Sequence, residues 1–348
     1  MLLDRPLLAT ALTFALAVGL ALPKGRHASN DAPAESAAGF RVGLVFDVGG
    51  RGDKSFNDAA WLGLSRAARE LHVATEVVEP AGTEDREAAL RLFAARSFDL
   101  VIGVGFIFSR DVDTVARDYP RTRFACVDYA PDFSGGVAQP IPPNVTGLAF
   151  REQEGAFLVG AIAGLTSKTR HVGFVGGMDI PLIHKFDAGY RTGVEAVCPP
   201  CVVHIAYAGS SPDAFRDPAK GKAIALAQIS AGADVLFHAS GSTGHGVFEA
   251  ARDAHVLAIG VDADQYDEAP SAVLTSMIKR GDVAVFDAIA AAQKGELRGG
   301  MLVLGVKEGA LDYVREGPHA DKLDPAVLRQ VEALRARIAA GAIDVPSE

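Results

Sequence analysis

From Arg41 onward, short apolar runs alternate with helical stretches along most of the chain. The runs consist largely of branched aliphatic residues, which is typical of strands buried on both faces of a parallel sheet. The predicted strands are Val42–Phe46, Ala74–Val78, Leu100–Val104, Phe124–Val127, Val145–Phe150, Val172–Val175, Val202–Ala206, Val235–Phe237 and Leu257–Val261, followed by Ala272–Ile278 and Met301–Val306. Strict alternation predicts parallel sheets with helices on both faces. Because these strands are too many for one ordinary sheet, the sequence predicts an α/β fold of two doubly wound lobes.

The segments between the strands carry the helical pattern. Asn57–Leu71 places its apolar residues on one stripe, as the buried face of an amphipathic helix requires. The same reasoning predicts helices at Thr83–Arg96, Glu152–Thr166, Leu182–Val197, Pro218–Ala231, Gly244–His255 and Gly281–Gln293, and a C-terminal docking helix within Leu323–Ala340.

Two breaks in the pattern indicate where the chain changes lobes. Proline and glycine are frequent between 131 and 143, and the polar run Asp262–Tyr266 follows a predicted strand. We therefore assign 41–147 and 265–298 to a first lobe, 148–262 and 299–316 to a second, and 317–348 to the docking helix. Several crossings of the chain between the lobes would form a multi-strand hinge.

The N-terminal 40 residues form a separate segment. The apolar run Leu7–Leu22 has the length of a signal-peptide core and is short for a membrane span. We expect residues 1–23 to be a signal peptide or an N-terminal anchor and residues 24–40 a linker. This predicts a periplasmic or otherwise extracytoplasmic protein and leaves a membrane anchor open as an alternative to cleavage. A buried N-terminal helix is the alternative. No cysteine lies near the end of the run, so no lipid-attachment site can be identified.

Charge and cysteine content restrict the classes of partner. The formal net charge of −9 disfavours binding to nucleic acid, whose phosphates an acidic surface repels. Of three cysteines, Cys126 lies in an apolar run and is expected to be a buried thiol. Cys198 and Cys201 form a C-x-x-C pair, which is typical either of a redox site or of a small structural disulfide. We expect the disulfide, because a strand rather than a helix is predicted after it. No cysteine and histidine spacing predicts a metal site.

The segment Asp47–Asn57 follows the first predicted strand and opens the first helix. Doubly wound folds place ligands there, at the carboxyl ends of strands. Its glycines match neither phosphate-binding pattern, and Asp47 would repel a phosphate, so a neutral polyol or base is favoured. Phe56 beside Asn57 resembles a stacking platform with a hydrogen-bonding neighbour. The simpler interpretation is a helix cap followed by a core phenylalanine.

The same segment resembles the signature of the basic membrane protein family of solute-binding lipoproteins, which includes purine nucleoside receptor proteins. The resemblance extends over about 300 residues and includes further motifs in the same order: Phe150–Gly160, Val172–Ile183, Phe186–Tyr190, Ile259–Gln265, Leu274–Lys279 and Gly341–Pro346.

This resemblance implies a type I periplasmic binding-protein fold that closes on a purine nucleoside and delivers it to an ABC importer in the membrane. It implies no enzymatic activity and no cofactor, and we expect a monomer. Carried over by position, it assigns stacking of the base to Phe56 and hydrogen bonds to the base edge to Asp47, Asn57 and Asp128. It assigns the ribose to Asp262 and Lys279, with Gly241 and its neighbours close to the sugar.

The chain departs from the family pattern at two points. The family has a phenylalanine facing the base where this sequence has Ser211, so Phe215 or Phe186 would have to supply the second aromatic wall. Phe186 also has a core interpretation, since it shares a predicted helix with Tyr190. The lipid-bearing cysteine is the second missing feature.

Three other functions compete with a nucleoside receptor. A sensor of the same fold could bind a sugar or a signalling molecule. A nucleoside-processing enzyme would need an Asp-rich calcium site, for a hydrolase, or a phosphate-binding glycine loop, for a dehydrogenase, and neither pattern appears. A repressor would need an N-terminal helix-turn-helix, where this chain has an apolar run.

Overall fold

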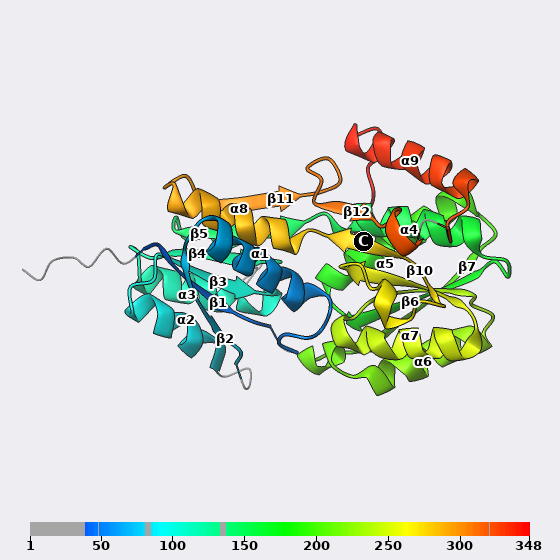
Figure 1. The fold of residues 1–348 in the computed structure, drawn as a ribbon, viewed down its shortest axis with the longest axis horizontal. Coiled ribbons are helices and arrows are strands. Elements are labelled where there is room, and N and C mark those ends of the chain that lie inside the picture. Colours follow the sequence, from blue (N-terminus) through cyan, green and yellow to red (C-terminus); the bar gives the residue numbers. More distant parts are fainter. Residues whose placement is uncertain (1–38, 48, 81–84, 133–136, 320) are drawn as a thin grey trace, which may run out of the picture. The chain divides into compact units, whose positions relative to one another are not determined.

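The computed structural model describes residues 39–47, 49–80, 85–132, 137–319 and 321–348. The expected signal peptide or anchor, and the linker up to residue 38, lie outside the described residues. In the described part the chain forms two six-stranded sheets, which are parallel except for one strand (Figure 1). This arrangement confirms the predicted α/β fold with two doubly wound lobes.

The first sheet has the strand order β11-β5-β4-β3-β1-β2. Its strands are β1 (Arg41–Val45), β2 (Ala74–Val78), β3 (Leu100–Val104), β4 (Arg123–Val127), β5 (Val145–Phe150) and β11 (Gly300–Leu304). Helices α1 (Phe56–Glu70) and α8 (Gly281–Gln293) pack together over one face, and α2 (Arg86–Ala95) and α3 (Ser109–Asp118) pack together over the other. Strands β1 and β3 to β5 are almost completely buried, as their unbroken apolar sequences predict.

The second sheet has the order β12-β10-β9-β8-β6-β7. Its strands are β6 (His171–Met178), β7 (Val202–Gly209), β8 (Val235–Ala239), β9 (Leu257–Asp262), β10 (Val273–Lys279) and the antiparallel β12 (Leu311–Tyr313). Helices α4 (Glu152–Thr166), α5 (Pro181–Val197) and α9 (Pro325–Ala339) lie on one side, and α6 (Pro218–Ser230) and α7 (Gly244–Ala254) on the other. The expected C-terminal docking helix is α9, which packs on α4.

Within the described residues, the chain passes between the sheets three times: after β5, after β10 and after β11. The expected lobe boundaries differ from the structure at two strands. β10, expected in the first lobe, pairs with β9 in the second sheet, and β11, expected in the second lobe, pairs with β5 in the first. An apolar pattern predicts that a strand is buried but carries no information about which sheet contains it, and this ambiguity explains both differences.

Two short elements did not emerge from the sequence pattern. Helix α3 is only ten residues long and strongly polar on its outer side, so its apolar positions are few. Strand β12 has three residues, which is too short for an alternating pattern to be visible. Among the described residues, no helix has both the length and the apolar character needed to cross a membrane.

Helices α4 and α5 pack unusually closely because glycines line their contact. A Cβ atom on Gly160 would lie 2.2 Å from the backbone oxygen of Tyr190, and one on Gly193 would lie 2.1 Å from that of Phe157. Only glycine lets two helix backbones approach to this distance. The pair forms one wall of the second lobe and fixes the start of α4, which carries Glu152 toward the hinge.

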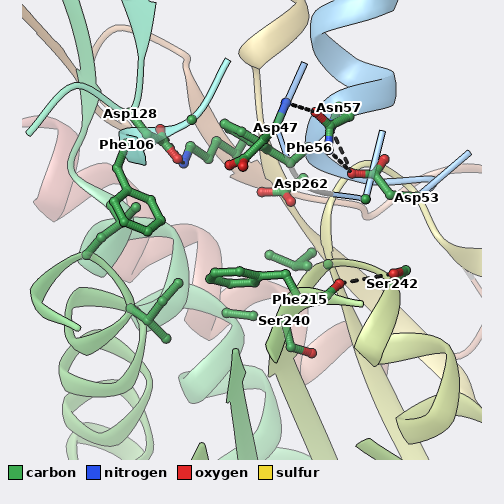
Figure 2. A pocket seen from close by; sticks show the side chains of 18 of the residues that line it. Asp47, Asp53, Phe56, Asn57, Phe106, Asp128, Phe215, Ser240, Ser242 and Asp262 are labelled. Atoms are coloured by element: carbon green, nitrogen blue, oxygen red, sulfur yellow. Dashed lines mark hydrogen bonds and ion pairs between the residues drawn. The ribbon is translucent and has the colours of Figure 1, made fainter. Parts of the chain in front are cut away.

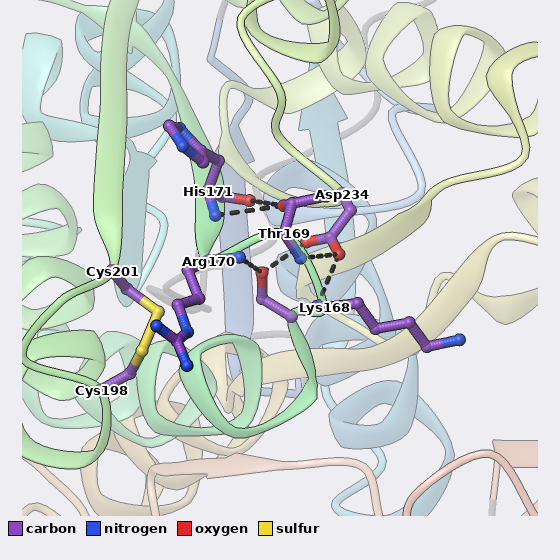
Figure 3. The surroundings of a disulfide bond; sticks show 8 residues. Lys168, Thr169, Arg170, His171, Cys198, Cys201 and Asp234 are labelled. Atoms are coloured by element: carbon purple, nitrogen blue, oxygen red, sulfur yellow. Dashed lines mark hydrogen bonds between the residues drawn. A yellow bond between two sulfur atoms is a disulfide. The ribbon is translucent and has the colours of Figure 1, made fainter.

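Cys198 and Cys201 form a disulfide between the end of α5 and the start of β7 (Figure 3). Cys198 caps the C-terminus of α5. Reactive C-x-x-C thiols are activated at helix N-termini, where the helix dipole stabilises a thiolate, and a C-terminus has the opposite effect. This position therefore favours the structural interpretation over a redox site. The remaining thiol, Cys126, is completely buried, and burial raises its pKa.

Candidate ligand-binding site

A pocket lies between the two lobes, at the carboxyl ends of several strands (Figure 2). It has about 660 Å³ of space, part of it open to solvent, which suits a small molecule. The first lobe contributes Asp47, Gly49, Asp53, Phe56, Asn57, Gly105, Phe106 and Asp128. The second contributes Leu182, Ile183, Phe186, Phe215, Ala239, Ser240, Gly241, Ser242, Val261, Asp262 and Lys279.

The structure brings all eight residues proposed from the sequence as ligand-binding residues to this one pocket: Asp47, Phe56, Asn57, Asp128, Phe186, Gly241, Asp262 and Lys279. Most of them follow or end a strand, so the parallel topology alone explains why they converge. Their contact with a ligand remains a prediction.

The loop before α1 is organised around the buried carboxylate of Asp53. This side chain accepts hydrogen bonds from the backbone N–H groups of Ser55, Asn57 and Asp58 and from the amide of Asn57, at 2.9–3.2 Å. Burial raises the pKa of Asp53, and these hydrogen bonds oppose the rise. The carboxylate thus caps the helix in place of the N-cap residue Ser55, whose side chain makes no capping bond. Phe56 is thereby fixed at the first position of α1, at the pocket wall.

Asn57 lies in the pocket wall with both ends of its amide bound to the protein. Its Oδ1 accepts from the backbone N–H of Asp47 at 3.0 Å, and its Nδ2 donates to Asp53 at 3.0 Å. The side chain is 3% exposed. These bonds tie the end of β1 to the start of α1, so the structure supports a positioning function for Asn57 at least as well as the expected contact with a base.

Lys279, the last residue of β10, is buried at the hinge beside two carboxylates. Its Nζ lies 2.7 Å from the carboxylate of Asp128, at the end of β4, and 3.1 Å from Oε1 of Glu152, at the start of α4. Burial opposes the charge on Lys279, but the two carboxylates outweigh it and raise the pKa above its usual value. Lys185 adds a second ammonium at 3.0 Å from Glu152. The cluster joins both lobes where the chain crosses between them.

Aromatic rings surround the same ammonium. Its Nζ lies 5.3 Å from the ring centroid of Phe56, 4.8 Å from that of Phe150 and 5.7 Å from that of Phe186. Cation–π attraction at these distances adds to the ion pairs, since the site is removed from water. Among the described residues, two of the three N–H donors of Lys279 have carboxylate acceptors, which leaves one donor for a ligand.

Two strand-end aspartates adopt the left-handed backbone conformation. Asp128 follows β4 with φ of 60°, and Asp262 ends β9 with φ of 66°. Non-glycine residues seldom adopt this conformation, although aspartate and asparagine tolerate it best. The turn redirects each carboxylate from the strand direction into the pocket, so the backbone strain coincides with the two carboxylates that the sequence singled out.

Asp262 receives a hydrogen bond from across the lobes. The hydroxyl of Ser55, in the first lobe, donates to its Oδ2 at 2.5 Å. Removal from bulk water raises the pKa of Asp262 to about 6, although Lys279 and the Ser55 hydroxyl act in the opposite direction. At neutral pH the group is therefore a carboxylate with further acceptor positions facing the pocket (Figure 2).

Both candidates for the second aromatic wall line the pocket. Phe186 on α5 is 4% exposed and belongs to the core, whereas Phe215 ends the short 3₁₀ helix η4 (Pro212–Phe215) and projects its ring into the cavity (Figure 2). Sequence reasoning missed Phe106, whereas Ser240 and Ser242 are the neighbours of Gly241 that it placed near the sugar. Phe106 lies just beyond the end of β3, so a search of every residue following a predicted strand would have found it.

The turn after β3 requires glycine because of Asp47. Gly105 has φ of 106°, and a Cβ atom there would lie 2.1 Å from Oδ2 of Asp47. Gly52 is a matched control, since it has φ of 94° and nothing within 4 Å of its added Cβ. We expect Gly105→Ala to reduce the free energy of unfolding by about 1–3 kcal/mol more than Gly52→Ala, the usual cost of overpacking. Chemical denaturation measures both. Equal losses would show that Asp47 does not occupy this space.

The chain is similar to known proteins over most of its length. The sequence pattern of the family "ABC transporter substrate-binding protein PnrA-like" (Bmp) matches residues 40–348. The chain is 34% identical to the CD4+ T-cell-stimulating antigen of Listeria monocytogenes, over 98% of each chain. It is 29% identical to the ABC transporter nucleoside-binding protein BmpA of Lactococcus lactis, over 89% of this chain and 90% of that one.

A solved structure agrees in fold and sequence. An ABC transporter solute-binding protein from Aeropyrum pernix superposes with a TM-score of 0.79 at 31% identity, covering 89% of this chain and 94% of that one. These matches confirm the family expected from the motifs, and substrate-binding proteins of ABC transporters serve a permease in the membrane. The protein belongs to the PnrA-like family of ABC transporter substrate-binding proteins.

Proposed function

We propose that this substrate-binding protein binds a nucleoside, with a purine base, in the pocket between its lobes and delivers it to its ABC permease. The observation that carries the proposal is the composition of the pocket: aromatic rings from both lobes, strand-end carboxylates and, among the described residues, one buried ammonium. The nucleoside-binding name of the Lactococcus relative supports it. We further propose that the protein acts outside the cytoplasm, as a monomer and without enzymatic activity.

The two chemical halves of a nucleoside match two parts of the pocket. A flat base suits the space between Phe56 of the first lobe and Phe215 of the second. Stacking on an aromatic ring is strong and is open to any base, since every base has a π-face. Ribose hydroxyls are donors and acceptors at once, so they suit the carboxylate of Asp262 and the remaining N–H of Lys279. Asp47 and Asp128 would accept hydrogen bonds from the base edge.

The charge of the pocket argues against a phosphorylated ligand. Four aspartates line it (Asp47, Asp53, Asp128 and Asp262), with Lys279 as the lining cation among the described residues. That cation is already neutralised by Asp128 and Glu152. A phosphate would be repelled at short range and would find no loop of backbone N–H donors of the phosphate-binding kind.

Truncating Phe56 tests the stacking surface. We expect Phe56→Ala to weaken binding of adenosine or inosine by about 1–3 kcal/mol, a rise in Kd of roughly fivefold to a hundredfold. Isothermal titration calorimetry measures the change. Leu62→Ala is the matched control, because Leu62 lies on the same helix and is 59% exposed. Equal affinity of the Phe56 variant and the control would remove Phe56 from the site.

A sensor for a sugar is the competing function. The ligand of such a sensor has no base to stack on Phe56. Phe56→Ala would then change the binding of nucleoside and of free ribose to the same extent, and wild-type protein would prefer the sugar. Preference for the nucleoside over ribose in the same titrations would favour the proposal.

A further inference from the structure

Besides the hinge cluster, the two lobes touch at a turn beside the pocket. Lys54 and Ser55 of the first lobe meet the segment that follows β9 in the second. Ser55 donates to Asp262, Lys54 Nζ pairs with Glu268, and the backbone oxygen of Lys54 accepts from the side-chain amide of Gln265 at 3.2 Å. Gln265 is 2% exposed, and nothing in the sequence motifs assigned it a function.

The hydrogen bonds of Gln265 leave only one orientation for its amide. The backbone N–H of Val261 lies 2.7 Å from one end and can only donate, so that end is Oε1. The backbone oxygen of Lys54 can only accept, so the group facing it is Nε2. The two ends of the amide therefore bond to different lobes. The oxygen accepts hydrogen bonds from its own, second lobe, and the nitrogen donates a hydrogen bond to the first lobe.

The oxygen end braces two strand ends of the pocket. Val261 immediately precedes Asp262, so holding its N–H fixes the strand just before the left-handed turn. The same oxygen lies 3.1 Å from Nε2 of His238, whose Nδ1 lies 3.3 Å from the hydroxyl of the pocket residue Ser240. Burial lowers the pKa of His238 to about 3, so the ring is neutral and donates through Nε2 to the amide oxygen.

Glycines in the surrounding backbone leave space for the side chains of Gln265 and His238. A Cβ atom on Gly260 would lie 2.8 Å from Oε1 of Gln265, and one on Gly244 would lie 2.0 Å from the ring of His238. The backbone N–H of Gln265 donates to Ser276 on β10 at 3.0 Å. Gln265 is thus held on three sides within its own lobe, and its Nε2 is directed at the other.

We propose that Gln265 is a positioning residue that couples closure of the lobes to the arrangement of Asp262 and Ser240 around the ligand. Two-lobed binding proteins open and close about their hinge, so a bond between the lobes that lies away from the hinge exists only in the closed form. In that form, the amide nitrogen of Gln265 holds the Lys54 backbone while its oxygen holds the end of β9. The inference rests on the proposed function. It predicts that the ligand leaves more slowly when the Gln265–Lys54 hydrogen bond is present than when it is removed.

Gln265→Glu separates the hydrogen bonds of the amide oxygen within the second lobe from the hydrogen bond of the amide nitrogen to Lys54. A carboxylate of the same shape still accepts from Val261 and His238, but it has no N–H for the Lys54 oxygen. We expect the dissociation rate of adenosine, measured by stopped-flow fluorescence, to rise roughly tenfold with little change in the association rate. The unfolding temperature of ligand-free protein is measured alongside and is expected to fall, because a carboxylate at this buried position has no cation partner. Lys54→Met is the matched control: it removes the side-chain pair with Glu268 but keeps the backbone oxygen, so its effect on release should be smaller.

An unchanged dissociation rate in Gln265→Glu, or an effect no larger than that of Lys54→Met, would overturn the proposal. If the variant does not fold, the side-chain amide signal of Gln265 in wild-type protein decides: adenosine should slow its hydrogen exchange, and unchanged exchange counts against the coupling. If wild type binds no nucleoside, the proposed function fails separately. Small-angle X-ray scattering of ligand-free protein then tests the coupling, since the Gln265 variant should have the larger radius of gyration, and equal radii would overturn it.

Discussion

Replacing Lys279 with methionine is expected to lower the free energy of unfolding by about 3–5 kcal/mol at pH 7, because it leaves Asp128 and Glu152 buried without their shared cation. Methionine fills a similar volume, so the loss reports charge rather than packing. The loss should shrink at acid pH. Burial already raises the pKa of Asp128, and losing the ammonium removes a charge that opposes the rise, so the protonated form of Asp128 stabilises the fold at low pH and this stabilisation disappears as pH rises.

Lys185→Met is the control for this experiment. Lys185 contacts the same Glu152, but its side chain is 30% exposed, so its removal should cost about 1 kcal/mol or less. Urea denaturation of both variants at pH 7 and pH 5 measures the effect. If Lys279→Met costs no more than Lys185→Met, the hinge cluster does not hold the lobes together as described.

Replacing Asp262 with asparagine is expected to weaken binding of a ribonucleoside by roughly tenfold to a hundredfold. Asparagine keeps the size and tolerates the left-handed backbone, but it loses the charge, and a hydrogen bond to a charged group contributes about 1.5–3 kcal/mol. The 2′-deoxynucleoside should lose less on mutation, because one hydroxyl partner is already absent. Calorimetry with both ligands, together with the melting temperature, distinguishes a sugar contact from a turn cap. Equal losses for the two ligands would place Asp262 outside the site.

The pH dependence of the two proteins provides a second comparison for Asp262. Folding raises its pKa from 3.8 to about 6, so the stability that this group contributes is present below about pH 4 and lost as pH rises through 6. The asparagine variant lacks that loss and should be no less stable than wild type at pH 7. Wild-type affinity should fall between pH 7 and pH 5 as the carboxylate is protonated, and the variant should lack this component of the fall.

Strand ends explain how the sequence could indicate which residues line this pocket. Asp47, Asp128, Asp262 and Lys279 each lie at or just beyond the end of an apolar run, and parallel topology brings such positions to one edge. The left-handed turns at Asp128 and Asp262 could not be read from the pattern, since they depend on the backbone beyond each strand.

Contacts between distant segments account for what the sequence could not predict. The apolar sequences of β10 and β11 are compatible with either sheet. Pairing with β9 places β10 in the second lobe, and pairing with β5 places β11 in the first. The base contact of Asn57 stays a prediction, and its hydrogen bonds with Asp47 and Asp53 could not be read from the pattern. Gln265 stands 211 residues from Lys54, so no local pattern could have indicated their hydrogen bond across the lobes.

Titration calorimetry of the ligand-free protein with a panel of nucleosides tests the central claim most directly. The panel should include adenosine, inosine, guanosine and cytidine, with adenosine monophosphate and free ribose as controls. The account predicts one-to-one binding of at least one purine nucleoside, much weaker binding of its monophosphate because of the pocket's aspartates, and much weaker binding of ribose because it lacks the base. Tight binding of ribose or of the monophosphate, with no heat from any nucleoside, would contradict it.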